Sequence, residues 1–383
     1  MTYRYVSLVF LTITTLTIFQ IAGTTTTAAT TSSAPTLQVS DAVGVDLTHL
    51  PLGDGKLSSA PKVGWIWPCH INPSAGGAFR NGPWIDTTNG TYDLTAKAVV
   101  QGKVNWPQHT LTVKLAGDKR IISTNDLPDH PTGNFPISRT DAAFQYDPNP
   151  NTIAAQNVTI DLPASPTLAT QPSCTPGAVG ILLSGAVLFN ALDAPGRDAV
   201  AHETQDGCQG HPQESGVYHY HSLTTCLPDT TSADGQSTLV GYAIDGFGIY
   251  GMRGKGGKIL TSADLDECHG QTSEVEWDGK MVMMYHYNAT WDFPYTIGCL
   301  RGTYDLANVR ALGGAPNAGP AQSGPPQGNP GSGQPDLAAA AAKLGISVQT
   351  LRQALGPPPP DLAAAAAKLG ISVQMLRDAL GLN

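Results

Sequence analysis

The sequence predicts a mainly β, disulfide-stabilised protein with a β-sandwich or barrel-like domain, and three observations support this fold class. Charged residues make up 13% of the 383 residues, where about 25% is usual. Glycine and proline number 42 and 30, which suits turn-rich β structure better than long amphipathic helices. Apolar and polar residues alternate in segments such as Leu111 to Leu115 and Val158 to Leu162, which is typical of strands.

Residues 1–23 have the pattern of a secretory signal peptide. One early arginine precedes an apolar run that ends at Phe19, and small residues follow near Ala22. An uncleaved run would act as an anchor instead. Residues 24–36 are almost all Thr, Ala and Ser and predict a spacer. We therefore expect a secreted protein, extracellular or periplasmic, or one retained at the cell surface.

Residues 37–312 predict one β-rich globular domain. Within it, Leu111 to Leu115 and a return strand beginning at Ile121 form an expected hairpin around Gly117 and Asp118. Residues 178–190 are almost continuously apolar, which indicates a strand or a strand pair buried on both faces.

Export favours disulfide bonds, and six cysteines is an even number. Thiolate zinc ligands are the alternative, but the sequence has no C-x-x-C pair. Six cysteines allow about fifteen pairings. We expect Cys208–Cys226, Cys268–Cys299 and Cys69–Cys174, because each of two similar motifs then has its own leading and trailing cysteine.

Those two motifs lie between residues 202 and 299, where six of the ten histidines are found. The first copy is Tyr218-His219-Tyr220-His221, and the second is Tyr285-His286-Tyr287-Asn288. In a strand, His219 and His221 would share one face at a separation of roughly 6.6 Å, with the tyrosines packed behind. Two such imidazoles suit a transition metal ion, copper or zinc first. The alternatives are a strand with two solvent-facing histidines and a cross-strand aromatic cluster.

Further candidate ligands surround this pair. They are His211, His202, His269, His286 and Asp245, the last of which is equally consistent with a simple Asp-Gly turn. His269 would compensate for the asparagine in the second copy, either in two half-sites around one ion or beside a degenerate second site. Asn288 also begins a glycosylation sequon, as do Asn89 and Asn157.

Past residue 312 the composition changes. Residues 313–335 lack aromatic, β-branched and charged side chains, which predicts a disordered Pro/Gly linker. Residues 336–356 and 361–383 are two copies of one repeat, separated by four prolines at 357–360. Alanine runs followed by Gly and Ser predict a small helical hairpin in each, and we expect these hairpins to self-associate or to contact the cell surface or wall.

The combination of motifs resembles the YHYH domain family over about residues 175–302. The resemblance rests on Leu183-Ser-Gly, Cys208-Gln-Gly-His211, Tyr218-His-Tyr-His221, Asp245-Gly-Phe-Gly-Ile-Tyr-Gly251, Asp266-Glu-Cys-His-Gly270 and Phe293-Pro-Tyr-Thr-Ile-Gly-Cys299. Members of that family are exported proteins without an established activity. The resemblance therefore implies the domain and the compartment, but no reaction.

Three functions fit the sequence. The first is a secreted metal-binding protein with copper or zinc in a histidine cluster. The second is a metal-dependent hydrolase or oxidase that uses the same histidines. An enzyme here would have to depend on a metal ion, because the nucleophile motif G-x-S-x-G is absent and bonded thiols leave no nucleophilic cysteine. The third is a metal-free surface module that binds carbohydrate or protein. A net charge of −9 without a basic cluster argues against nucleic acid as a partner.

Overall fold

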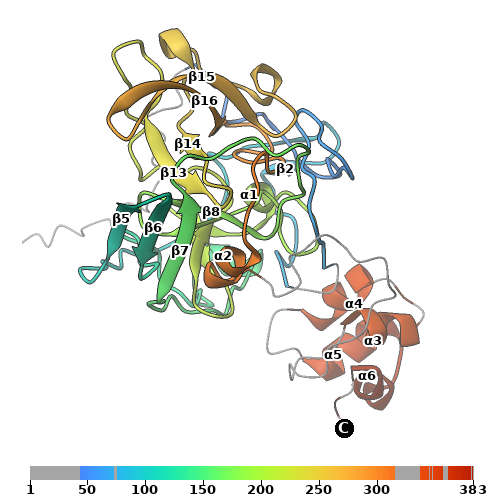
Figure 1. The fold of residues 1–383 in the computed structure, drawn as a ribbon. Helices are drawn as coiled ribbons and strands as arrows, with labels where there is room; N and C mark the ends of the chain where they lie inside the picture. The colour runs from blue at the N-terminus through green and yellow to red at the C-terminus, as the bar shows by residue number, and fades with distance from the viewer. Residues whose placement is uncertain are drawn as a thin grey trace, which may run out of the picture. The chain divides into compact units, whose positions relative to one another are not determined.

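The computed structural model describes residues 44–72, 76–314, 337–344, 346, 348–356, 361–380 and 382 (Figure 1). The predicted signal peptide, the spacer, most of the linker and the four-proline segment lie outside these residues. Within the described part of the chain, no helix combines the length and apolar character needed to cross a membrane.

The mainly β prediction is confirmed, since 27% of the chain is strand and 15% is helix. An eight-stranded sheet forms the centre (Figure 1). It contains β8 (Ala178–Leu182), β9 (Val187–Phe189), β11 (Gly210–Pro212), β12 (Tyr218–Tyr220), β13 (Leu239–Ala243), β14 (Gly248–Tyr250), β15 (Gly270–Trp277) and β16 (Lys280–Asn288).

Three smaller sheets and several short helices surround the large sheet. The small sheets are β1 (Leu50–Pro51), β3 (Thr91–Tyr92) and β2 (Ile85–Asp86); β4 (Val99–Val100) with β10 (Gln205–Asp206); and β5 (Leu111–Ala116), β6 (Lys119–Thr124) and β7 (Val158–Pro163). The helices of this region are η1 (Ala142–Gln145), α1 (Ala199–His202), η2 (Lys255–Gly257), η3 (Ser262–Asp264) and α2 (Leu306–Ala311).

The strand order of the large sheet is symmetric about its centre: β11-β12-β9-β8-β13-β14-β16-β15. At the centre β8 and β13 are antiparallel, with Ile181 opposite Tyr242, Leu182 opposite Gly241 and Gly180 opposite Ala243. Each strand of the first half (β8, β9, β11, β12) thus has a counterpart in the second half (β13, β14, β15, β16). The sheet is a duplicated unit related by an approximate twofold axis near Ile181 and Tyr242.

Glycines at the central strand pair follow the same symmetry. A Cβ on Gly180 would lie 2.6 Å from the Tyr242 carbonyl oxygen, and one on Gly241 would lie 2.6 Å from the Ile181 carbonyl oxygen. Both distances are far below van der Waals contact, so each strand needs glycine where its partner approaches most closely.

Both strand predictions outside the histidine window are confirmed. β5 and β6 pair as a hairpin, and β7 adds to β6 with Val158, Ile160 and Leu162 buried and the residues between them exposed. Residues 178–190 form the antiparallel pair β8 and β9. The three expected disulfides, Cys69–Cys174, Cys208–Cys226 and Cys268–Cys299, are all present.

The C-terminal repeats form α3 (Leu337–Leu344), α4 (Val348–Leu355), α5 (Leu362–Leu369) and α6 (Val373–Leu380). Each repeat contributes two helices, and the two repeats share one apolar core rather than forming separate hairpins. Leu351 and Leu376, at the same position of each repeat, are completely buried. A unit of about 20 residues has too little core to be stable alone, and the pairing of two repeats supplies the missing surface.

Replacement of Leu376 by alanine should destabilise both repeats together. The buried leucine leaves a cavity in the shared core, which costs about 2–5 kcal/mol. Hydrogen exchange should then accelerate in residues 337–344 as well as in α6. The control Met375→Ala, at a side chain 53% exposed on the same helix, should change stability by less than about 0.5 kcal/mol. Faster exchange confined to α6 would contradict the shared core.

Candidate metal centre

The two motif copies form matching hairpins in the two halves of the sheet. In the first, Gly210, His211 and Pro212 pair with Tyr220, His219 and Tyr218. In the second, Gly270, Gln271 and Thr272 pair with Tyr287, His286 and Tyr285. The register equates Gln271 with His211, His286 with His219 and Asn288 with His221.

An aspartate organises the base of each hairpin, and it is buried in the first and half-buried in the second. Asp206 accepts hydrogen bonds from the backbone N–H of Cys208 (2.9 Å) and Gly210 (3.3 Å) and from the Tyr218 hydroxyl (2.9 Å). The loop is tight: Gln209 has a φ of 63°, and a Cβ on Gly210 would lie 2.3 Å from the Tyr218 hydroxyl oxygen. The first tyrosine of the motif therefore braces the hairpin from behind.

The second hairpin repeats this arrangement. Asp266 accepts from the N–H of Cys268 (2.9 Å), the N–H of Gly270 (2.9 Å) and the Tyr285 hydroxyl (3.1 Å). His269 takes the place of Gln209, with a φ of 73°. Nε2 of its ring contacts the Thr290 hydroxyl at 3.0 Å.

The first hairpin gathers three histidines on one face. One ligand atom of each of His211, His219 and His221 lies within 4.8 Å of the others, and all three residues are buried. Their ring centroids are 4.6 to 5.4 Å apart. Phe189 of β9 stacks on the His219 ring at 4.2 Å and covers the cluster from the neighbouring strand.

Backbone carbonyls orient two of these rings. Nδ1 of His221 lies 2.6 Å from the Asn190 carbonyl oxygen, and Nδ1 of His219 lies 3.3 Å from the Val217 carbonyl oxygen. A carbonyl only accepts, so Nδ1 carries the hydrogen, and in a neutral ring Nε2 keeps its lone pair for a metal ion. Burial, and then the neighbouring histidines, lowers the pKa of His211 and His219 well below the usual range, which favours the neutral, metal-binding form.

Glu203 completes the cluster, although the sequence analysis did not select it as a ligand. Its Oε2 lies 3.2 Å from Nε2 of His221 and 3.4 Å from Nε2 of His211. This oxygen and both ring nitrogens of His211 are buried and make no hydrogen bond with the residues described. One signal was available: Glu203 stands three residues before Asp206, whereas Ala263 stands three residues before Asp266, so the acid occurs only beside the complete histidine set.

A buried lysine holds the segment that carries Glu203. The Lys97 ammonium donates to the Val200 carbonyl and to Oε1 of Gln205 (2.7 Å), on either side of Glu203. Burial lowers the Lys97 pKa to about 8. β10 follows directly and pairs in parallel with β4, which fixes the direction of the chain after Glu203.

The structure does not bring the other predicted ligands to the cluster. Nε2 of His202 contacts Asp54 at 2.9 Å, and His269 contacts Thr290. His286 lies in the second hairpin, where its ring packs edge-on against Tyr250 at 4.8 Å. Asp245 accepts hydrogen bonds from the Tyr287 hydroxyl (2.6 Å) and the Gly302 N–H (2.9 Å), and so it links β16 to the segment at Gly302.

Burial distinguishes the three glycosylation sequons, and the disulfide bonds decide the role of a second His/Cys group. Asn288 is completely buried, whereas Asn89 and Asn157 are exposed, so a glycan fits only the latter two sequons. His130 lies beside Cys208 and Cys226, but these two sulfurs are bonded to each other, and Nε2 of His130 contacts the Tyr220 hydroxyl at 2.6 Å.

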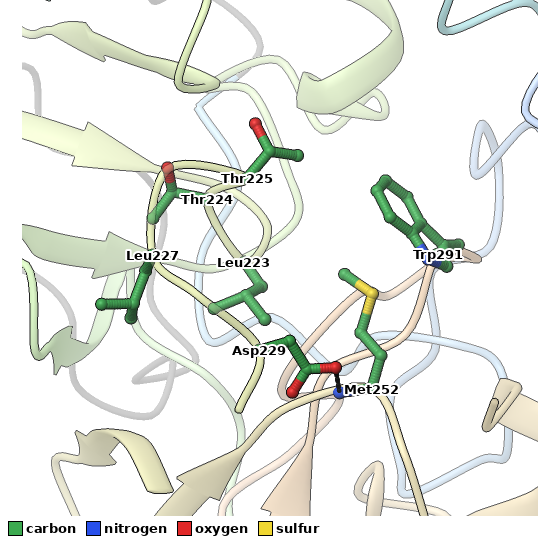
Figure 2. A pocket seen from close by; sticks show the side chains of 7 residues that line it. All are labelled: Leu223, Thr224, Thr225, Leu227, Asp229, Met252 and Trp291. Atoms are coloured by element: carbon green, nitrogen blue, oxygen red, sulfur yellow. Dashed lines mark hydrogen bonds between the residues drawn. The ribbon is translucent and has the colours of Figure 1, made fainter. Parts of the chain in front are cut away.

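A small cavity of about 10 Å³ lies beside the disulfide loop, between Leu223 and Trp291 (Figure 2). Asp229, at its edge, accepts a hydrogen bond from the Met252 N–H at 3.3 Å. The volume suits about one water molecule, and none of the cluster residues lines it. The cavity is therefore separate from the histidine cluster and too small for an organic substrate.

The fold and the site together define a disulfide-bonded, mainly β protein with a buried cluster of three histidines and one carboxylate. Residues 159–258 match the model of the family described as YHYH protein, which confirms the resemblance. The matched segment contains Glu203 and the whole histidine cluster and ends before the second hairpin. No curated protein and no solved structure matches the chain significantly.

Asp147 gives the stability of the folded protein a testable pH dependence. Burial, and then the charge of Glu203, raises the Asp147 pKa to about 7. Between about pH 4 and 7 the folded state thus binds more protons than the unfolded state, so stability falls as pH rises through this window. Asp147→Asn keeps an oxygen acceptor for the Thr204 N–H (3.0 Å) and removes the titration.

In urea unfolding with a chelator, the free energy of unfolding of Asp147→Asn should therefore fall less between pH 4 and 7 than that of the wild type, by on the order of 1 kcal/mol or more. Glu214→Gln, at an exposed carboxylate, serves as the control. Identical slopes for the wild type and Asp147→Asn would show that Asp147 does not retain its proton.

Proposed function

We propose that this is an exported metal-binding protein whose ion, zinc or copper, is held by His211, His219, His221 and Glu203. The observation that carries the proposal is the contact between His221 and Glu203. In the neutral His221 ring, Nδ1 donates to Asn190, so Nε2 faces Oε2 of Glu203 at 3.2 Å with a lone pair. Two acceptors at this distance repel each other unless a cation lies between them.

Glu203 has a second histidine contact at the same oxygen. Nε2 of His211 lies 3.4 Å from Oε2. One metal ion between these groups would be bound by all three atoms at once. A tetrahedral ion with bonds of about 2.0–2.1 Å sets its ligands about 3.3 Å apart, and the two measured separations bracket that value. One ligand atom of His219 lies within 4.8 Å of those of His211 and His221, close enough to bind the same ion.

The donor types indicate which ions fit. Three imidazoles and one carboxylate suit zinc and copper, while calcium and magnesium prefer oxygen ligands throughout. Four protein ligands in a buried site are typical of a structural or storage site. Glu203 has the most exposed side chain of its contact set, at 12% against 4% for His211 and His221. Displacement of this carboxylate would open the position that a metal-dependent enzyme requires.

Export is part of the proposal. It is supported by the signal-like residues 1–23 and by three disulfides, which persist in oxidising compartments. The Cys208–Cys226 bridge closes the loop that contains all three histidines, so an oxidising compartment would also preserve the metal centre.

The purified, untagged full chain should contain about one zinc or copper ion per molecule by elemental analysis. His219→Ala should reduce this content to background, because it removes a ligand. The matched control is His286→Ala, which changes the equivalent position of the second hairpin and should leave the content unchanged. With ligand at 100 times the dissociation constant, binding should raise the free energy of unfolding by about 2.7 kcal/mol.

Absence of metal after incubation with Zn(II), Cu(II) and Cu(I) would rule out both the storage and the enzyme hypotheses. Equal metal loss in His219→Ala and His286→Ala would place the ion elsewhere.

Removal of the Cys208–Cys226 bridge should weaken metal binding, because it frees the loop that positions the three histidines. Outer contacts of this kind typically change affinity about 10–100-fold, so we expect at least about a tenfold loss for Cys208→Ala/Cys226→Ala in competition with a coloured chelator. Cys268→Ala/Cys299→Ala removes the equivalent bridge of the second half. It should cost a similar stability, about 2–5 kcal/mol, without the loss of affinity.

A further inference from the structure

We infer that Gln271, His286 and Asn288 form a second, latent metal site, in which an amide hydrogen bond takes the place of the ion. The inference rests on the proposed function of the first half. It concerns the second half of the sheet, where none of these residues has an assigned role. The ligand class is the same: a zinc-like or copper-like ion that binds imidazole.

The backbone positions of the two sites match in detail. His221 Nδ1 approaches the Asn190 carbonyl at 2.6 Å, and Asn288 Nδ2 donates to the Gly251 carbonyl at 3.1 Å. Asn190 and Gly251 follow equivalent strands, β9 and β14, which pair in parallel with β12 and β16.

The retained histidine also has matching contacts. His286 Nδ1 lies 3.2 Å from the Met284 carbonyl, as His219 Nδ1 lies 3.3 Å from that of Val217. An aromatic ring from the neighbouring strand covers each imidazole, Phe189 in the first half and Tyr250 in the second. His286 Nε2 is buried and makes no hydrogen bond with a described residue, so this nitrogen remains available as a ligand.

The chemistry of the other two positions differs in one respect. Gln271 Nε2 donates to Asn288 Oδ1 at 2.8 Å, so this pair consists of a donor and an acceptor and is stable without a cation. At the equivalent positions, His211 and His221 both face the Glu203 carboxylate. The two halves thus join the edge strand to its neighbour in two ways, by an amide pair in one and by an ion in the other.

This equivalence predicts that the amide pair and the histidine site can be exchanged between the two halves. Gln271→His/Asn288→His should create a three-histidine site beside His286. His211→Gln/His221→Asn should close the first site with an amide pair. Metal content per chain should be about one in the wild type, two in the first variant, zero in the second and one in the protein that carries all four changes. The new site should bind more weakly than the first, because Ala263 stands at the sequence position that corresponds to Glu203.

The test is a titration of the full chain with Zn(II) and Cu(II), followed by competition with a chelator. A wild type that binds one ion and a folded Gln271→His/Asn288→His protein that also binds one would overturn the inference and leave the proposed function intact. A wild type that binds none would instead reject the proposed function. The variant would still test the latent site, by a gain from zero to one.

The reciprocal variant gives a test that does not depend on the created site folding. In chelator, His211→Gln/His221→Asn should melt at a higher temperature than His211→Ala/His221→Ala, because the amide pair restores the link between β11 and β12. Its melting temperature should also be unaffected by added metal. Equal melting temperatures for the two variants would overturn the idea that an amide pair can replace the ion.

Discussion

The structure of both hairpins depends on one aspartate at the base of each, Asp206 in the first and Asp266 in the second. Asp206 binds two backbone N–H groups of the cysteine loop and the tyrosine hydroxyl of the facing strand. Burial raises the pKa of this carboxyl group, and the hydrogen bonds oppose that shift. These contacts fix the register that places His211 opposite His219. The motif's tyrosines thus stabilise a geometry that its histidines use, and Asp266 shows that the scaffold persists where the ligands are absent.

The two halves share the residues that hold each hairpin together and differ in the residues that could bind an ion. Both halves keep the aspartate, the cysteine, the left-handed residue and the glycine under the tyrosine ring. They differ where a side chain faces the site: three histidines and a glutamate in one, and one histidine with two amides in the other. The first set makes the turn and the hydrogen bonds at the base of the hairpin in both halves. The second set links the edge strand to its neighbour by different chemistry in each half.

Burial controls the charge of the groups around Glu203. It lowers the pKa of His211 and His219 and raises that of Asp147 to about 7, which favours their neutral forms. The buried Lys97 is bonded to the Val200 carbonyl and to Gln205 rather than to Glu203.

The sequence by itself determined the fold class, the strands from Leu111 to Leu162 and the strand pair at residues 178–190, because these depend on local periodicity. Among about fifteen possible cysteine pairings it favoured the three that form, since each motif copy then has its own leading and trailing cysteine. It also placed His211 near His219 and His221, since two strand positions and one disulfide loop constrain them, but together with four other candidates. Only the tertiary structure decided the rest. Glu203 reaches the cluster because β10, which follows it, lies against β4 and β11. His202, His269, His286 and Asp245 have other partners, because a ligand set is defined by distances between segments, which spacing along one chain does not specify.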